Sequence, residues 1–513
     1  MDDDACYRAL STRDARFDGR LFVGVKTTGI YCRPICPART PLRQNVRFFP
    51  SAAAAQGAGF RPCLRCRPET APDLGAWRGT SNTVARALAL IETGALDEGD
   101  VEGLASRLGV GERQLRRLFR QHLGASPVAV AQTRRVLLAK QLIHETQLPM
   151  AQVALGAGFG SVRRFNETFQ QLFDRPPIEL RRSEGPETAI EGAGGIEVSL
   201  AYRAPYDWEA MLAFLGLRAI PGVESVEGGV YSRVIAIGED LGVISVRPLG
   251  RQRLGVTVRF PKIGALASII ARVRRVFDLA ADPAAIGAHL AEDAALAPLV
   301  AARPGLRVPG AWDGYELAIR AILGQQITVT AARGLAGKLA AAHGARLPHA
   351  LAAAPDLTHA FPGAARLANA DFAALGMPGS RAQALTSLTA AVIADPLIFG
   401  PRHSLDEAVA RLKALPGIGE WTAQYIAMRE LREPDAFPAA DIGLMRALAG
   451  PDGVRPSPAE LLERAERWRP WRAYAALHLW ASEAPAKPAK IKAPKAGAKT
   501  LQPKVKADDR QAA

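Results

Sequence analysis

Four cysteines near the start of the chain have the residue type and spacing of a metal site. Cys32 and Cys36 are separated by three residues and Cys63 and Cys66 by two, with 26 residues between the pairs. The one other cysteine, Cys6, leaves the thiols concentrated in a single segment, unlike a disulfide framework. Two short spacings allow four sulfur ligands to close a tetrahedron, which suits zinc. The spacing predicts one Zn²⁺ per chain and, taken alone, favours a structural zinc ribbon.

A second candidate for chemistry is the segment LPGIGEWTAQYIAMRE, residues 415–430. Gly417 and Gly419 allow a tight turn between two helices, whose backbone N–H groups can bind a DNA phosphate without reading sequence. Asp441 follows 22 residues after Gly419, directly before an amphipathic helical pattern. The pattern predicts a helix-hairpin-helix followed by a carboxylate.

Aromatic residues accompany this hairpin. Trp421 and Tyr425 lie on its second helix, and Trp480 lies near the end of the helical region. Electron-rich rings favour cationic, electron-poor groups through stacking and cation–π attraction. Core packing is the alternative for each ring taken singly.

A helical pattern occurs twice between residues 80 and 182. Apolar residues at helical spacing, a short glycine-containing turn and a second amphipathic segment recur about fifty residues apart. This predicts two helix-turn-helix units; an ordinary helical bundle with a basic surface is the alternative. The residues expected on the outer face of the two second helices, where base edges and phosphates could be contacted, are Arg113, Gln114, Arg116, Arg117, Arg120, Ser161, Arg163, Arg164 and Asn166.

Composition limits the class of protein. A chain of 513 residues with 48% hydrophobic residues predicts three or four globular domains. No apolar run could span a membrane and the N-terminus is acidic, which predicts a soluble cytoplasmic protein with no membrane partner. The net charge of +15 favours polyanions such as DNA. Seven Lys and one Arg against two Asp place +6 of this charge in residues 484–513, a Lys/Pro/Ala-rich segment predicted to be disordered.

The cysteine segment resembles the N-terminal domain of the Ada family, which repairs alkylated DNA. The resemblance rests on GIYCRPICPAR and GFRPCLRC. It implies that the residue matching the family's methyl acceptor, Cys32, takes a methyl group irreversibly from DNA methylphosphotriesters. Methylation would reduce the charge of a zinc tetrathiolate from −2 to −1 and so strengthen binding to phosphates. Arg33, Arg39 and Arg43 are candidates for those phosphate contacts, with solvated surface charge as the alternative for each.

Two other parts of the chain also resemble known families. The paired helical pattern resembles the helix-turn-helix domain of AraC-type activators. Residues 196 to 483 resemble the AlkA branch of DNA glycosylases, 3-methyladenine DNA glycosylase II, through RAILGQQITVTAA, the hairpin, PAADIGLMRAL and RWRPWRAYAALHLW. This implies that Asp441 assists departure of a flipped base, with Tyr425 and Trp480 in the base pocket.

Two positions refine the glycosylase resemblance. Trp421 stands where glycosylases that also cleave the strand carry a lysine, so we expect a monofunctional enzyme. Gln326 stands where the best-known AlkA inserts a leucine into the base stack, which predicts a different way of holding the flipped state.

We therefore predict a multidomain chain that senses methylation, activates transcription and excises bases. Its partners would be alkylated and promoter DNA and RNA polymerase, and a monomer suffices. A regulator with a non-catalytic glycosylase-like half, and an enzyme whose cysteine domain is only a docking ribbon, are the alternatives. The expected parts are a small zinc-binding α+β domain (1–75), an all-α double helix-turn-helix domain (80–182), a linker (183–195), an α+β AlkA N-terminal domain (196–305), an all-α helix-hairpin-helix glycosylase domain (306–483) and the tail (484–513).

Overall fold

The computed structural model describes residues 3–14, 17–71, 82–97, 99–181, 195–250, 252–351, 354–400, 404–450 and 452–483. The predicted tail and nearly all of the predicted linker lie outside these residues. Within them, no helix combines the length and apolar content that crossing a membrane requires.

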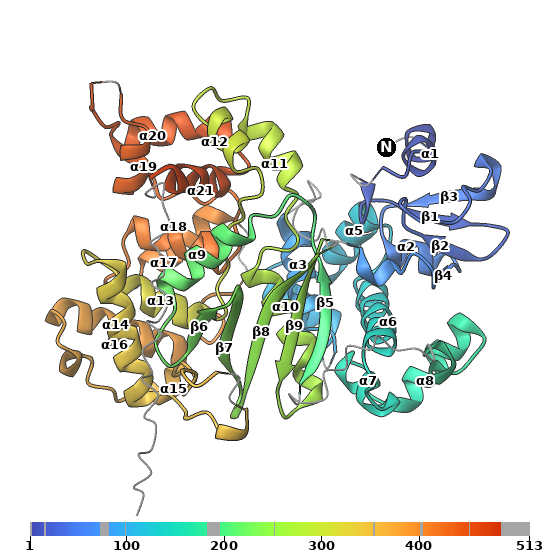
Figure 1. The fold of residues 1–513 in the computed structure, drawn as a ribbon, viewed down its shortest axis with the longest axis horizontal. Helices are drawn as coiled ribbons and strands as arrows, with labels where there is room; N and C mark the ends of the chain where they lie inside the picture. The colour runs from blue at the N-terminus through green and yellow to red at the C-terminus, as the bar shows by residue number, and fades with distance from the viewer. Residues whose placement is uncertain are drawn as a thin grey trace, which may run out of the picture.

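The N-terminal part is a small four-stranded sheet with helices beside it (Figure 1). The strand order is β3-β1-β2-β4, and β2 and β4 run parallel while the other neighbours are antiparallel. Ser51 begins the covering helix by accepting a hydrogen bond from the Ala54 N–H. The elements are α1 (Asp3–Ser11), β1 (Phe22–Val25), β2 (Ile30–Cys32), the 3-10 helix η2 (Arg43–Asn45), β3 (Val46–Phe49), α2 (Ala52–Gly57), β4 (Arg61–Pro62) and the 3-10 helix η3 (Pro68–Thr70).

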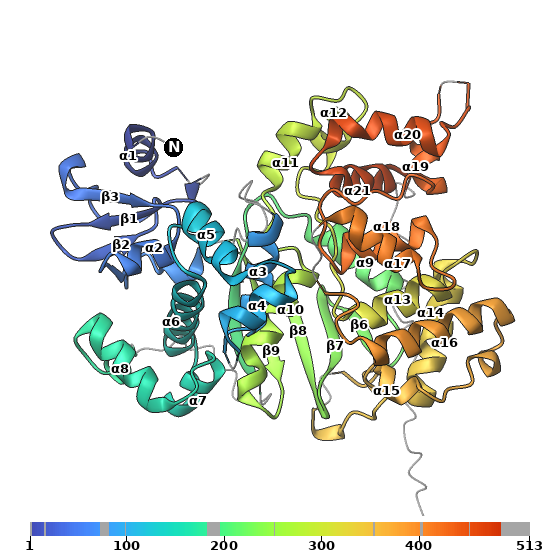
Figure 2. The same cartoon turned by 180° about the vertical axis from the view of Figure 1, so that it is seen from behind.

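Six helices follow, and the longest of them, α6, joins two similar helix pairs (Figure 2). The buried residues Leu115, Phe119 and Leu123 of α5 have counterparts fifty residues later in α8, where all three are phenylalanines. Both helices also end at a residue with positive φ. The helices are α3 (Asn82–Glu92), α4 (Val101–Arg107), α5 (Glu112–Leu123), α6 (Pro127–Glu145), α7 (Met150–Gly156) and α8 (Val162–Phe173).

A five-stranded antiparallel sheet occupies the middle of the molecule (Figure 1). Its order is β5-β9-β8-β7-β6. One cluster of buried apolar side chains runs from α6, α7 and α8 through this sheet to α10, so the second helix-turn-helix unit and the sheet share a core. The elements are β5 (Ile196–Ala201), α9 (Trp208–Arg218), β6 (Glu224–Glu227), β7 (Val230–Ile237), β8 (Asp240–Gly250), β9 (Arg253–Arg259) and α10 (Leu266–Val276).

The remaining residues form a helical region with a core of its own around the buried helix α13. Asp313 begins α13 by accepting hydrogen bonds from the N–H groups of Tyr315 and Glu316. The helices are α11 (Pro283–Leu290), α12 (Ala297–Ala302), α13 (Gly314–Leu323), α14 (Val329–His343), α15 (Ala364–Leu367), α16 (Gly379–Ala394), α17 (Leu405–Lys413), α18 (Glu420–Arg429), α19 (Ile442–Ala447), α20 (Pro458–Ala465) and α21 (Arg472–Glu483).

Candidate metal centre and nucleic-acid sites

The parallel pairing of β2 with β4 brings the two cysteine pairs together. Tyr31 lies opposite Pro62, so Cys32 ends one strand at the level where Cys63 follows the other. The four Sγ atoms lie within 4.8 Å of one another. Four sulfur donors at this separation fit one zinc ion, and the predicted cofactor is confirmed by this arrangement together with the family match given below.

The four cysteines differ in accessibility. Cys36, Cys63 and Cys66 are each 7% exposed, whereas Cys32 is half-buried. Backbone N–H groups point at two of the buried sulfurs: the Arg33 N–H lies 3.4 Å from Cys66 Sγ and the Arg65 N–H 3.3 Å from Cys63 Sγ. Such donors orient and stabilise metal-binding thiolates. Cys32 is therefore the most exposed residue of the four.

The three arginines predicted to contact phosphates lie in different surroundings. Arg39 is exposed, and Arg43 is half-buried and paired with Asp3 at 3.1 Å. Arg33 is buried, with its Nε 2.8 Å from an Asp18 carboxylate oxygen and an Nη 3.3 Å from the Cys66 carbonyl oxygen. The prediction for Arg33 is corrected, because a guanidinium held inward by a carboxylate supports the cysteine loop and cannot face a phosphate in this arrangement.

The predicted outer faces of α5 and α8 are exposed. The polar residues named for the two helices all lie on the solvent side, and the apolar residues Leu115, Phe119, Phe165 and Phe169 are buried. Ser161 has a further role, since its Oγ accepts a hydrogen bond from the Arg164 N–H and begins α8. Two of the exposed arginines form ion pairs on their own helix: Arg116 pairs with Glu112 at 2.5 Å and Arg163 with Glu167 at 2.8 Å. Exposed pairs of this kind are weak and can exchange for phosphates.

Asp441 lies at the N-terminus of α19 between two indoles. Trp421 Nε1 donates to one carboxylate oxygen at 2.8 Å and Trp480 Nε1 to the other at 2.9 Å. The Leu444 N–H also donates to the carboxylate, at 3.0 Å, which makes Asp441 the cap of the helix. Three donors match an acceptor-only carboxylate and fix its orientation.

The aromatic side chains near Asp441 come from two helices. The rings of Trp421 and Tyr425, one turn apart on α18, are stacked with centroids 5.1 Å apart and planes 10° apart. Arg429 Nη1 donates to the Tyr425 hydroxyl at 2.6 Å. Burial raises the pKa of Tyr425, but the guanidinium groups of Arg429 and Arg218 outweigh that effect, and the pKa lies below its ordinary value.

These groups face a cavity of about 630 Å³ between the sheet and the helical region. Trp421, Tyr425, Asp441 and Trp480 line it, so the structure brings together the residues predicted for the base pocket and for catalysis. The sequence did not indicate Arg429, which also donates to the Pro309 and Gly310 carbonyls, 120 and 119 positions away. No local pattern marks such a residue, because its partners are distant in the chain.

The hairpin between α17 and α18 has the predicted glycine geometry. Gly417 has a φ of +81°, and a Cβ there would lie 2.3 Å from the Ala384 Cβ. Gly419 immediately precedes α18, and a Cβ there would meet open space. Gln325 supports the turn by donating to the Gly417 carbonyl at 2.9 Å. The exposed Gln326, predicted at the wedge position, has a φ of +57°, a left-handed conformation that projects it from the turn after α13.

Three family models match successive parts of the chain. Residues 5–69 match the metal binding domain of Ada, residues 104–183 a helix-turn-helix domain, and residues 197–313 the AlkA N-terminal domain. The predicted multidomain fold class is confirmed by these matches together with the sheets and helices described above.

Curated relatives cover both halves. A Mycobacterium tuberculosis protein described as "Probable bifunctional transcriptional activator/DNA repair enzyme AlkA" is 42% identical over 481 residues, 93% of this chain and 96% of that protein. DNA-3-methyladenine glycosylase 2 of Escherichia coli is 38% identical over 56% of this chain and 97% of its own length. The bifunctional transcriptional activator/DNA repair enzyme Ada of the same species is 35% identical over 31% of this chain and 43% of its own length. The predicted fusion is thereby confirmed, and the chain belongs to the family of the mycobacterial protein, in which an Ada-type metal-binding and helix-turn-helix half precedes an AlkA-type half.

Proposed function

We propose that this chain is a monofunctional DNA glycosylase for alkylated bases such as 3-methyladenine, joined to an alkylation-sensing transcription activator. The observation that carries the glycosylase activity is the placement of the Asp441 carboxylate beside stacked aromatic rings in one cavity. The similarity to relatives described as a DNA-3-methyladenine glycosylase and as bifunctional activator/repair enzymes supports both parts.

Excision requires the base to leave the helix and enter the cavity. A volume of about 630 Å³ accommodates a purine, and Trp421, Tyr425 and Trp480 offer aromatic surfaces on which it can stack. A base alkylated on a ring nitrogen is cationic, so π faces favour it over an unmodified base. Selectivity then follows from stacking and from the weaker glycosidic bond of the cationic base.

Asp441 acts on the sugar. The bond from C1′ to the base nitrogen breaks with its electron pair leaving on the base, water adds to C1′, and the proton of the water is released. The carboxylate stabilises the positive charge that develops on the deoxyribose, or activates the attacking water. The two indole N–H groups keep both carboxylate oxygens in a fixed orientation toward the cavity.

The hairpin holds the damaged duplex without reading its sequence. Its backbone N–H groups at the start of α18, next to Gly419, suit a phosphate. Gln326, projecting from the turn after α13, takes the space of the departed base. Trp421 occupies the position of the lysine that would form a Schiff base, so no strand cleavage accompanies excision.

Cys32 receives the methyl group of a DNA methylphosphotriester. Its Sγ attacks the methyl carbon, an S–C bond forms, and the C–O bond breaks with its electron pair remaining on the phosphodiester. Bound zinc lowers the thiol pKa and keeps the cysteine sulfurs ionised at neutral pH. Accessibility supports the choice of Cys32, since the other three sulfurs belong to buried residues. The methyl group is not removed from the thioether product, so the reaction occurs once per chain.

The helix-turn-helix units direct the methylated protein to promoters. The second helix of each unit, α5 or α8, enters the major groove with its exposed polar face toward the bases. RNA polymerase is the partner of the activator, and a monomer suffices because both units belong to one chain. The division into parts at 1–75, 80–182, 183–195, 196–305, 306–483 and 484–513 belongs to this proposal.

Two assays test the proposal. Incubation with alkylated duplex DNA should release 3-methyladenine; if the intact chain releases none, the alternative of a regulator with a non-catalytic half is correct. Mass spectrometry after incubation with methylphosphotriester DNA should find one methyl group on the Cys32 peptide. An unmodified Cys32 peptide in zinc-loaded protein would leave the cysteine domain as a docking ribbon.

A further inference from the structure

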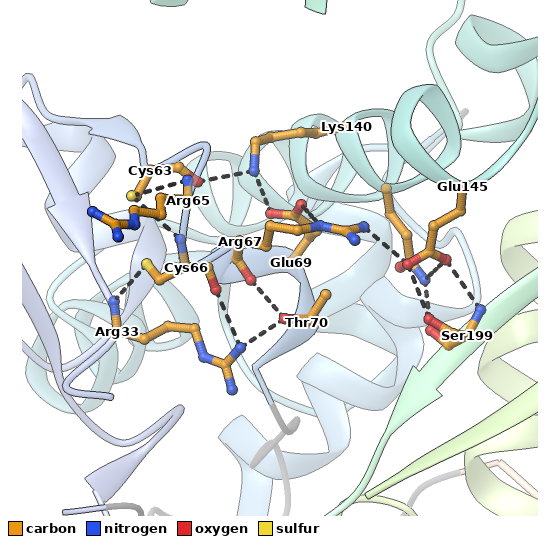
Figure 3. A network of polar contacts seen from close by, with 11 residues as sticks. Arg33, Cys63, Arg65, Cys66, Arg67, Glu69, Thr70, Lys140, Glu145 and Ser199 are labelled. Atoms are coloured by element: carbon orange, nitrogen blue, oxygen red, sulfur yellow. Dashed lines mark hydrogen bonds and ion pairs between the residues drawn. The ribbon is translucent and has the colours of Figure 1, made fainter. Parts of the chain in front are cut away.

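A buried lysine connects the cysteine centre to the helix-turn-helix part. Lys140 lies on α6, and its side chain has no exposed surface. Its Nζ donates to the Cys63 carbonyl at 3.0 Å and lies 2.6 Å from a Glu69 carboxylate oxygen (Figure 3). Losing either charge of such a buried pair leaves the other uncompensated, which is strongly destabilising. The turn that carries two of the zinc ligands is therefore fixed against α6.

The same polar chain continues along α6. Arg67, which follows the last zinc ligand, donates to Glu69 at 3.0 Å and to Glu145 at 2.9 Å. Lys140 and Glu145 lie on α6 more than one turn apart, and the arginine reaches between the two ends of this stretch (Figure 3). Positive and negative side chains alternate along this series of contacts, in the order Lys140, Glu69, Arg67 and Glu145, so each charge is compensated by its neighbours.

This series of polar contacts ends on β5, the first strand of the glycosylase half. The Glu145 carboxylate accepts hydrogen bonds from the Ser199 backbone N–H at 3.0 Å and from the Ser199 hydroxyl at 2.9 Å. Gln141, one turn earlier on α6, donates to the Ser199 carbonyl at 2.7 Å. Ser199 lies in β5, an edge strand, and these bonds occupy its N–H and C=O. Side chains of α6 thus bind the outward-facing backbone groups of Ser199 at this edge of the sheet.

The two strands at the opposite edge of this sheet, β7 and β6, line part of the cavity of about 630 Å³ that contains Asp441. Tyr231 and Arg233 of β7 and Glu224 of β6 line the cavity, and Arg233 pairs with Glu316 of α13 at 2.7 Å. A continuous ladder of backbone hydrogen bonds joins β5 to these strands. A change in the order of β5 therefore reaches elements that shape the cavity.

A second buried link joins the cysteine loop to the same half. Arg33 donates to the Cys66 carbonyl at 3.3 Å and to the Asp18 carboxylate at 2.8 Å. The Asp18 carbonyl accepts a hydrogen bond from Arg203, which follows β5 and also pairs with Asp282 at 3.5 Å. Both links begin at backbone carbonyls of zinc-binding cysteines and end at or just beyond β5.

We propose that these two links, through Glu145 and through Arg203, couple the cysteine centre to the glycosylase half, so that the metal occupancy and methylation state of the centre set the order of β5. Only the methylation arm rests on the proposed function. Loss of zinc frees the Cys63–Cys66 turn, and methylation removes one unit of negative charge from the centre whose Cys63 and Cys66 carbonyls bind Lys140 and Arg33. Each change weakens the polar links and increases local opening of the strand.

Hydrogen–deuterium exchange of the full-length chain measures the coupling. We expect peptides covering residues 196–201 to exchange at least about fivefold faster after zinc is removed by a chelator, the lower limit of typical site-to-site coupling. The response should be smaller in Glu145→Gln and in Arg203→Gln and absent from the double variant. Glu197→Gln is the matched control, because Glu197 lies on the same strand but pairs at 2.7 Å with the exposed Arg247.

Several outcomes would overturn the proposal. Exchange of residues 196–201 that is equal with and without zinc in the unaltered chain excludes coupling, and a full response in Glu145→Gln excludes the route through α6. Bound zinc measured in each variant distinguishes lost coupling from a lost metal site. For the methylation arm, methylphosphotriester DNA is the donor and mass spectrometry verifies the methylated Cys32 peptide. Unchanged exchange in verified methylated protein overturns sensing of methylation, whereas failure to methylate counts against the proposed transfer and leaves the zinc result to decide the coupling.

Discussion

Replacing Asp441 with asparagine removes the negative charge proposed for catalysis but keeps an oxygen that can cap α19. Asparagine and aspartate are about equally good helix caps, so the Leu444 N–H keeps its acceptor and α19 still begins there. The Trp480 indole N–H shares the oxygen that caps the helix and keeps it, so the Trp421 indole N–H loses its carboxylate oxygen and faces an amide NH₂. We expect the free energy of unfolding to fall by about 1–2 kcal/mol, the cost of one unsatisfied donor.

The effect on excision should be far larger. A unit negative charge about 4 Å from the developing positive charge on the sugar contributes about 4 kcal/mol at an effective dielectric constant of about 20. This corresponds to a decrease of about 10³-fold in the single-turnover rate of 3-methyladenine release. Asp371→Asn is the matched control, since the exposed Asp371 caps the 3-10 helix η7 (Phe372–Leu375) of the same half and should leave the rate unchanged. A rate for Asp441→Asn within tenfold of the unaltered chain would refute the electrostatic role.

Three further outcomes follow from the structure. Gln326→Ala should slow excision from a well-paired duplex more than from a mismatched one, measured as the ratio of single-turnover rates, because a mismatched base needs less help to leave the stack; equal slowing would show that Gln326 does not act on flipping. Cys36→Ser should lower bound zinc well below one per chain in elemental analysis, since a buried sulfur ligand is lost, and a full equivalent would contradict the ligand set. Burial lowers the pKa of His478 from 6.5 to about 4, so the unfolded chain takes up this proton first as pH falls. The melting temperature should therefore decrease between about pH 6.5 and 4, and it should decrease less steeply in His478→Phe. Parallel curves for the two proteins would exclude His478 as the source of this pH dependence.

The sequence predicted those parts of the sites that depend on local spacing. Leu115 and Phe119 are buried with exposed arginines between them, because helical periodicity alone separates the two faces. The hairpin glycines were likewise predictable, since Gly417 adopts a conformation that other residues avoid. The four cysteines come together through one pair of parallel strands.

The errors and omissions have a common physical cause, which is pairing between charges distant in sequence. Arg33 looked like a surface cation, and only its contact with Asp18 shows that it faces inward. Lys140 gave no local signal, because its partners Cys63 and Glu69 lie 77 and 71 positions away. Arg429 was missed for the same reason. Periodicity reports which side of a helix is apolar, but it does not report which buried charge has a distant partner.

With this distribution of charge, the proposed methylation of the cysteine centre would act both on bound DNA and on the buried cations. Lys140 and Arg33 contact the cysteine loop from the buried side, whereas Cys32 is the most exposed of the four cysteines. One unit of charge at about 4 Å is worth about 1 kcal/mol in water and about 4 kcal/mol at an effective dielectric constant of about 20. Removing one negative charge from the centre should therefore alter its attraction to the buried cations more than its repulsion of a solvated phosphate at equal distance. Under the proposed methyl transfer, the centre would change DNA affinity through Cys32 and, through the proposed links, the order of β5 through its buried side.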